Sequence, residues 1–141
     1  MTEITFYTFA EDKLDIARRL AAKAYAQGKR VMLYAPDTTT ADALDRMLWT
    51  TPALSFVPHC RDTHALASET PVLIGANADA LPRPDVMINL HHDWPPAFAR
   101  FERLLEIVSQ DEHDREQSRA RYRFYQERGY AITPLDLRNP A

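Results

Sequence analysis

Residues 4–35 read ITFYTFAEDKLDIARRLAAKAYAQGKRVMLYA, and this stretch decides the fold class. The apolar and β-branched run at 4–9 predicts a buried strand, and VMLYA at 31–35 predicts a second one. Between them, apolar residues recur at helical spacing, and Gly28 is typical of a residue that ends a helix. A strand, a helix and a strand in so short a segment form a right-handed βαβ unit, so we expect a parallel sheet.

The rest of the chain continues this alternation. Compact apolar runs predict further strands at 71–76 and 85–90, and helical spacing predicts helices at 38–49, 98–108 and 112–128. One of the threonines at 38–40 is expected to be the N-cap of the first of these helices. The run YAITPLDL at 130–137 predicts an edge strand, because Pro134 has no backbone N–H to donate within a sheet.

These elements predict one α/β domain over residues 1–141. The expected architecture is a three-layer α/β/α sandwich with a mostly parallel central sheet, Rossmann-like but without a nucleotide-binding loop. Only Gly28, Gly75 and Gly129 are glycines, and the segment after the first strand carries Glu11 and Asp12 where a phosphate site needs glycine amides and a cation. We therefore expect no cofactor and no intrinsic enzymatic activity. The alternative is a remnant of a nucleotide-binding enzyme, which we call the relic nucleotide enzyme.

Charge and cysteine content narrow the class of protein. The formal net charge of −3 argues against a surface that wraps duplex DNA. The lone Cys60 cannot form an internal disulfide, and no apolar run approaches the roughly 18 residues of a membrane span. The N-terminal stretch does not resemble a secretory signal. These features predict a cytoplasmic protein.

Two histidine-containing segments have residue types that bind metals, HCRDTH at 59–64 and HHD at 91–93. Their spacing does not match a structural zinc site, so we expect plain surface residues and no metal. Cys60 with His59 or His64 is the candidate nucleophile and base pair. Because neighbours in sequence rarely have the geometry of a catalytic dyad, we expect no catalytic residue.

The segment REQSRARYRFYQERGY at 115–130 is rich in arginine and aromatic residues. Arg115, Arg119 and Arg123 follow one another at i,i+4 spacing and share a helical face with Tyr122. Such a face suits an anionic ligand that also carries an aromatic group. Two alternatives remain open: an ordinary amphipathic helix with solvated arginines, and a module that binds single-stranded nucleic acid directly through arginines and stacked tyrosines.

The stretch WTTPALSFVPH at 49–59 combines apolar residues with two prolines. Pro52 and Pro58 remove backbone donors and favour extended conformations before them, so we expect a loop or an edge. Its apolar side chains must pack on the protein's own core or be covered by a partner.

Several stretches together resemble the chi subunit family of bacterial DNA polymerase III. They are TFY at 5–7, QGKRV at 27–31, LDRMLWTTPALSFVPH at 44–59, PVLIG at 71–75 and RARYRFYQERGY at 119–130. The resemblance covers essentially the whole chain. Its most specific part is the pattern L-D-x-x-L-W-x-x-P-x-x-S-F-V-P-H at 44–59.

The resemblance implies a non-catalytic accessory subunit of the clamp loader. Such a subunit binds the acidic C-terminal tail of single-stranded DNA-binding protein, which ends in phenylalanine with a free carboxylate, and so reaches DNA only indirectly. The implied tail-binding residues are Val108, Arg115, Arg119, Tyr122, Gly129 and Thr133, to which we add Arg123 because it extends the same face. A second implied surface binds the psi subunit, or an equivalent clamp-loader or helicase partner, through Trp49, Pro52, Phe56, Val57 and Pro58.

Overall fold

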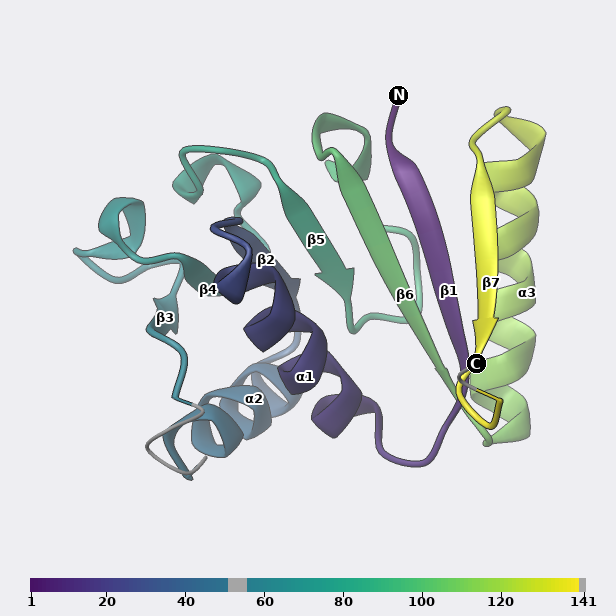
Figure 1. Cartoon of the computed structure of the whole chain (residues 1–141), viewed down its shortest axis with the longest axis horizontal. Helices are drawn as coiled ribbons and strands as arrows, with labels where there is room; N and C mark the ends of the chain where they lie inside the picture. The colour runs from purple at the N-terminus through teal and green to yellow at the C-terminus, as the bar shows by residue number, and fades with distance from the viewer. Residues whose placement is uncertain (51–55, 140–141) are drawn as a thin grey trace.

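The computed structural model describes residues 1–50 and 56–139, and its strands form one parallel sheet (Figure 1). The strand order is β3-β4-β2-β5-β6-β1-β7. The strands are β1 (Glu3–Ala10), β2 (Val31–Tyr34), β3 (His59–Arg61), β4 (Val72–Gly75), β5 (Val86–Asn89), β6 (Arg103–Ser109) and β7 (Ile132–Asp136). Each neighbouring pair is parallel, which confirms the predicted sheet type. The predicted βαβ unit is wider than expected, because β5 and β6 lie between β1 and β2.

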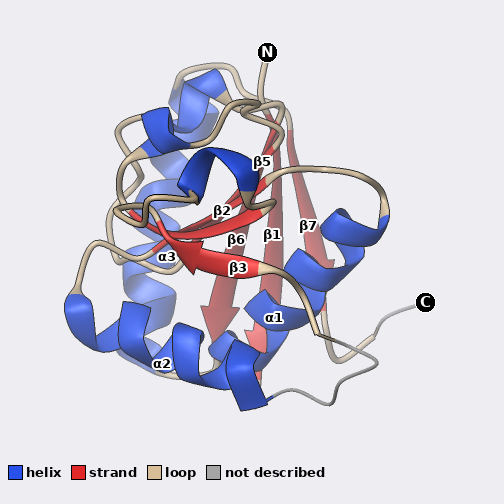
Figure 2. Cartoon of the chain, turned by 90° about the vertical axis from the view of Figure 1, so that its left-hand side faces the viewer, coloured by secondary structure: helices blue, strands red, loops and turns tan. Residues whose placement is uncertain are grey.

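Helices cover both faces of the sheet (Figure 2). Helices α1 (Lys13–Ala26) and α2 (Thr38–Thr50) pack on one face, and α3 (Glu112–Glu127) packs on the other. The alternation of strand side chains divides the core accordingly: Val31 and Leu33 of β2 face α1 and α2, whereas Met32 faces the α3 side. This arrangement confirms the predicted three-layer α/β/α fold. Within the described ranges, no helix is both long and apolar enough to cross a membrane.

The helix predicted at 98–108 is wrong. Residues Phe98–Arg100 form a 3-10 turn, and Arg103–Ser109 form β6, which lies between β5 and β1. Every residue from Leu104 to Val108 is buried, as is usual in a parallel strand with both faces covered. A mostly apolar run of this length, interrupted only by Glu106, fits either a buried strand or a buried helix, and its spacing alone does not separate the two.

The ends of the helices follow simple local rules. Gly28 and Gly129 come just after α1 and α3 with φ of 76° and 81°, the left-handed conformation expected at those positions. The prediction of a threonine N-cap for α2 is wrong. The Asp37 carboxylate instead accepts a hydrogen bond from the backbone N–H of Thr40 at 2.9 Å, because a carboxylate is at least as good a cap as a hydroxyl. This interaction lowers the pKa of Asp37.

Candidate functional site

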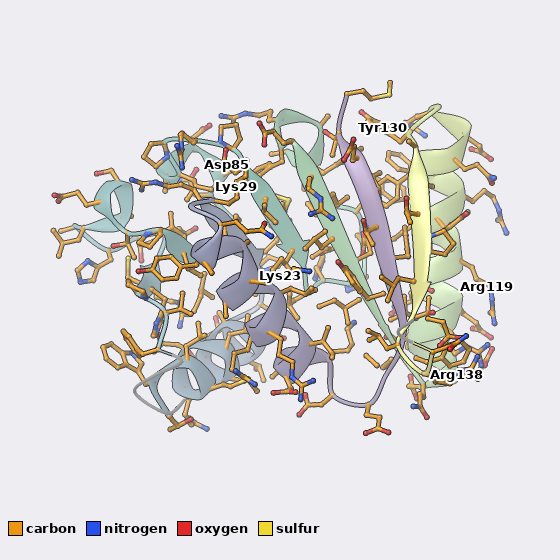
Figure 3. All side chains as sticks on the ribbon, viewed as in Figure 1. Lys23, Lys29, Asp85, Arg119, Tyr130 and Arg138 are labelled. Carbon is orange, nitrogen blue, oxygen red and sulfur yellow. The ribbon has the colours of Figure 1, made fainter. Side chains whose placement is uncertain are left out.

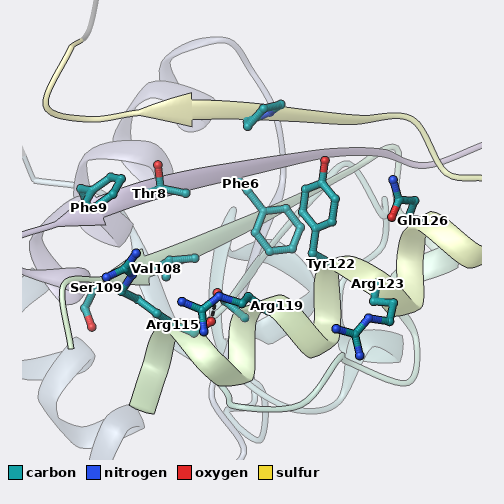
Figure 4. A pocket seen from close by; sticks show the side chains of 12 residues that line it. Phe6, Thr8, Phe9, Val108, Ser109, Arg115, Arg119, Tyr122, Arg123 and Gln126 are labelled. Atoms are coloured by element: carbon teal, nitrogen blue, oxygen red, sulfur yellow. Dashed lines mark hydrogen bonds between the residues drawn. The ribbon is translucent and has the colours of Figure 1, made fainter. Parts of the chain in front are cut away.

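A pocket of about 400 Å³ lies between α3 and the strands β1, β6 and β7 (Figure 4). Three of the four elements are strands of the sheet, and the fourth is the arginine-rich helix. The lining residues are Phe6, Thr8 and Phe9 of β1, Val108 and Ser109 of β6, Pro134 of β7, and Arg115, Ser118, Arg119, Tyr122, Arg123 and Gln126 of α3. Figure 4 shows Arg115 and Phe9 toward one end of the pocket and Arg123 and Gln126 toward the other.

The interior of the pocket is apolar and aromatic. Phe6 pairs in register with Pro134 of β7, so both side chains point toward α3. The rings of Phe6 and Tyr122 lie 5.2 Å apart, and Val108 is buried beside them. Such a surface favours an aromatic or aliphatic side chain of a ligand over a polar one.

Arginines of α3 form the rim of the pocket. Glu112 lies 3.4 Å from a guanidinium nitrogen of both Arg115 and Arg119, and all three side chains are at least partly exposed. Long, exposed ion pairs of this kind contribute little to the free energy of folding, so Glu112 holds the two arginines only weakly. In the part of the chain that the structure describes, the Arg123 side chain has no hydrogen bond or ion pair. The rim therefore offers guanidinium groups to an incoming anion.

The first turn of α3 is fixed to the end of β6 and to α1. Asp111 caps the helix, and Asp114 accepts a hydrogen bond from the backbone N–H of Ser109 at 2.7 Å. Lys13 of α1 lies 3.1 Å from the other carboxylate oxygen of Asp114. Burial raises the pKa of Asp114, but Ser109 and Lys13 outweigh that effect and lower it below its usual range. This turn sets the position of Arg115 relative to β1.

A buried polar cluster sets the rotation of α3 about its axis. Glu106 of β6 is fully buried and accepts hydrogen bonds from Arg121 Nε at 3.0 Å and from Tyr125 OH at 2.6 Å. Asn89 Nδ2 donates to both carboxylate oxygens at 3.0 and 3.2 Å. Burial raises the pKa of Glu106, while Arg121 and these donors oppose the rise. Because Arg121 and Tyr125 must point inward, Arg119 and Arg123 point to the pocket rim.

Burial also raises the pKa of the Tyr125 hydroxyl far above its usual range, so this group stays a donor. Arg121 donates a second hydrogen bond, from Nη1 to the backbone oxygen of His92 at 2.8 Å. The five arginines between residues 115 and 128 thus have different roles. Arg121 is 1% exposed and belongs to the core, a difference that the arginine count in the sequence does not reveal.

The structure brings together five of the seven residues expected to bind the tail. Val108, Arg115, Arg119, Tyr122 and Arg123 all line the pocket. The other two are placed differently. Gly129 ends α3 outside the lining, and Thr133 lies next to Pro134 in β7, where alternation directs neighbouring side chains to opposite faces.

Sequence reasoning missed the strand side of the pocket. The sequence marks Phe6 and Pro134 as strand residues, and Phe6 also as part of the family stretch at 5–7, but it marks neither of them nor Phe9 as part of a binding site. Alternation along β1 is the signal that could have identified Phe6, but only tertiary structure shows that its face meets α3. No sequence signal marks Phe9, whose φ of 60° is unusual for a bulky residue.

A second apolar surface lies at the end of α2, far from the pocket. The side chains of Trp49 and Phe56 are 63% and 37% exposed, and their rings lie 5.4 Å apart. We call these two residues the Trp49–Phe56 patch. Val57, in contrast, is 2% exposed and packs in the core, while Pro58 is half-buried. Pro52 lies outside the described residues.

The histidine, cysteine and aspartate residues that could act in catalysis or bind a metal do not form a comparable site. His59 packs against Trp49 at 5.0 Å between ring centres, whereas Cys60 packs with the opposite core. Their side chains therefore face opposite sides of the sheet, which excludes them as a catalytic dyad. His91, His92 and Asp93 place their donor atoms within 4.8 Å of one another at the end of β5. Such a group of neighbouring surface residues is common without a metal.

Loop amides that could bind a phosphate are bonded to the chain's own carboxylates. Asp12 accepts hydrogen bonds from two N–H groups at the start of α1. Asp62 accepts from Ala76 and Asn77 at 3.0 and 2.8 Å, and its carboxyl fills the space beside Gly75. The relic nucleotide enzyme thus gains no support from these loops.

Comparisons with known proteins agree with the resemblance seen in the sequence. Residues 1–133 match the family model described as DNA polymerase III chi subunit, HolC. The chain is 32% identical over 136 residues to the DNA polymerase III subunit chi of Pseudomonas aeruginosa, covering 94% of each chain. It is 27% identical over 141 residues to the Escherichia coli subunit chi, covering 94% of this chain and 96% of that one.

A solved structure shows the same fold in a different protein. Yeast Dbp5, bound to Nup159, Gle1, IP6 and ADP, superposes with a TM-score of 0.68 at 14% identity. The match covers 98% of this chain but only 42% of that one, so it supports the α/β fold alone. Family membership follows from the sequence matches over nearly the full length. The chain belongs to the DNA polymerase III chi subunit family, whose members are part of the DNA polymerase III holoenzyme and act in DNA replication.

Proposed function

We propose that this chain is a non-catalytic accessory subunit of the clamp loader, acting in the cytoplasm, that binds the acidic C-terminal tail of single-stranded DNA-binding protein in the α3 pocket. The observation that carries the proposal is the meeting of an apolar pocket with a rim of exposed guanidinium groups. A chain end with a terminal aromatic residue, a free carboxylate and acidic neighbours is complementary to both parts.

The geometry supports a simple binding mechanism. The terminal ring of the tail enters the pocket between Phe6, Val108 and Tyr122. Its carboxylate accepts hydrogen bonds from Arg115 and Arg119, in exchange for their long contacts with Glu112. Charge on the rim accelerates the encounter, and burial of the ring slows dissociation.

The aromatic residues of α3 argue against direct binding of single-stranded nucleic acid. Base stacking needs exposed ring faces. Tyr125 is fully buried, and Tyr122 is half-buried against Phe6. Phe124 is covered by Trp94, with ring centres 3.6 Å apart, and by the guanidinium of Arg128 at 3.6 Å. The rings of Tyr125 and Phe124 are therefore covered, and Tyr122 offers only the part of its ring that lines the pocket, so peptide binding is the function that the geometry favours.

Fluorescence anisotropy with a labelled tail peptide tests the proposal. Removing the terminal phenylalanine from the peptide is expected to weaken binding by at least about tenfold, because burying such a side chain contributes about 1.5–3 kcal/mol. A peptide with an amidated C-terminus tests the carboxylate separately. A naked oligonucleotide is expected to bind more weakly than the intact peptide. The opposite ranking would replace this proposal by the direct nucleic-acid module.

We also propose that the Trp49–Phe56 patch binds the psi subunit or an equivalent clamp-loader or helicase partner. The patch lies at the α2 end of the molecule, away from α3, so both partners can bind at once (Figure 1). Two adjacent exposed rings provide the kind of anchor that dominates many interfaces.

Replacing Trp49 by alanine is expected to reduce capture of purified psi or an equivalent partner about tenfold, because an aromatic anchor commonly contributes more than 1 kcal/mol. Tail-peptide affinity should stay at the value of the parent chain, since Trp49 is on a different element from the pocket. A pull-down together with anisotropy on the same preparation measures both. Loss of both partner capture and tail binding would indicate a folding defect. Retention of both would exclude the Trp49–Phe56 patch as the binding surface for this partner.

A further inference from the structure

Phe9 has an unusual backbone conformation at the edge of the pocket. Among residues 1–50 and 56–139 it is the only non-glycine residue with positive φ, at 60°. It lies where the pairing of β1 with β6 changes register, between Tyr7 and Ala10. A bulky side chain in this region of backbone space is strained, and such strain persists where the surroundings enforce it, often at ligand sites.

Two guanidinium groups from different elements meet at the Phe9 ring. Arg138, which follows β7, lies with Cζ 3.4 Å from the ring centre, and Arg115 of α3 lies 5.4 Å from the same centre. The segment after β7 is held over Phe9 by a hydrogen bond that Leu137 N donates to Thr8 O at 3.0 Å. Figure 3 shows Arg138 on the same side of the molecule as Arg119.

Arg138 already binds one carboxylate in this position. It donates to Asp136 from Nε at 3.1 Å and from Nη2 at 2.7 Å. No residue in the described ranges accepts a hydrogen bond from its Nη1 group. A guanidinium stacked on a ring still donates in its own plane, so Nη1 can donate to a second carboxylate while Nε and Nη2 hold Asp136. Arg115 likewise has only its long contact with Glu112.

We propose that Phe9 and Arg138, beside Arg115, form a subsite that binds an acidic side chain preceding the terminal residue of the tail. This inference rests on the proposed function and deepens it by naming a recognition element outside α3. The strained Phe9 backbone directs the ring between the pocket and Arg138, so that the ring both closes one end of the pocket and supports the guanidinium. The subsite thus binds a side-chain carboxylate, while the pocket binds the terminal ring.

The test compares two peptides and three variants. Both peptides end in phenylalanine with a free carboxylate, and the second has every acidic side chain replaced by its amide. Arg138→Ala is expected to lower the affinity for the acidic peptide about fivefold, as for the loss of an exposed ion pair. Its affinity for the amide peptide should fall less than about twofold. Arg138→Lys should restore affinity only in part, because lysine does not stack in the same way. Arg100→Ala removes a comparable exposed ion pair, with Asp79, away from the pocket and should change neither affinity.

A variant of Phe9 gives an independent measurement. Phe9→Gly adopts positive φ without steric cost, so it should remain folded by circular dichroism while binding of the acidic peptide falls. Equal losses for both peptides in Arg138→Ala, or no loss for either, would overturn the subsite while leaving the proposed function intact. If the parent chain binds neither peptide, the proposed function fails and the subsite fails with it.

Discussion

Replacing Glu106 by glutamine is expected to lower the free energy of unfolding by about 3–5 kcal/mol, because it leaves Arg121 as an uncompensated buried charge. Glu106 is 0% and Arg121 1% exposed, and the two side chains are joined at 3.0 Å. Tyr125 and Asn89 donate to the same carboxylate, and glutamine replaces one of its two oxygens by an NH2 group, so the three buried donors are left with a single acceptor oxygen. Denaturation in urea, followed by tryptophan fluorescence and circular dichroism, measures the loss.

Two further variants separate the buried charge from general damage. Glu102→Gln changes an exposed glutamate one residue before β6, whose contact with Lys29 is 3.6 Å, and should alter stability by less than about 1 kcal/mol. Adding Arg121→Met to Glu106→Gln removes the unpaired charge and should recover part of the lost stability. If the double variant is instead less stable than Glu106→Gln, and the further loss is as large as that expected for an independent Arg121→Met substitution, the two residues are not coupled.

Replacing Arg115 and Arg119 together by alanine is expected to weaken tail binding about hundredfold. Each hydrogen bond to a charged group contributes about 1.5–3 kcal/mol, and both guanidinium groups face the pocket. Arg119→Ala alone should cost about tenfold by the same reasoning. Both variants should flatten the dependence of affinity on salt concentration, because screened charge pairs have been removed. Anisotropy titrations at several salt concentrations measure both effects.

Arg128→Ala is the matched control for this experiment. It removes one arginine beside the same helix, but Arg128 lies over Phe124 at 3.6 Å and does not line the pocket. Its affinity for the tail peptide should equal that of the parent chain. If Arg128→Ala weakens binding as much as Arg119→Ala, net charge rather than the pocket controls affinity, and the assignment of the site is wrong.

The order of the elements followed from local sequence in most of the chain. Residues 4–35 predicted a strand, a helix and a strand, and β1, α1 and β2 confirm them. Pro134 predicted an edge position, and β7 is the edge of the sheet next to β1. The failure at 98–108 has a clear reason. β6 is stabilised by its neighbours β5 and β1, and pairing with strands from distant parts of the chain overrides local spacing.

The helix face that carries the rim was also predictable, since Arg115, Arg119 and Arg123 follow from i,i+4 spacing alone. The strand side of the pocket was not. Phe6 and Pro134 reach it only because β1 pairs with β7 in a particular register, and their sequence separation hides that contact.

The amino-acid sequence by itself thus determined the family, the charged face of α3 and, outside residues 98–108, the alternation of strands and helices, because each depends on periodicity or on a local pattern. Only the tertiary structure decided which arginine is buried and which is free, and where Phe9 lies. Arg121 is buried because it binds Glu106, and Phe9 is covered by Arg138 in the segment after β7. Both contacts join residues that are distant in the chain. Burial and charge pairing are properties of such long-range contacts, so no local pattern encodes them.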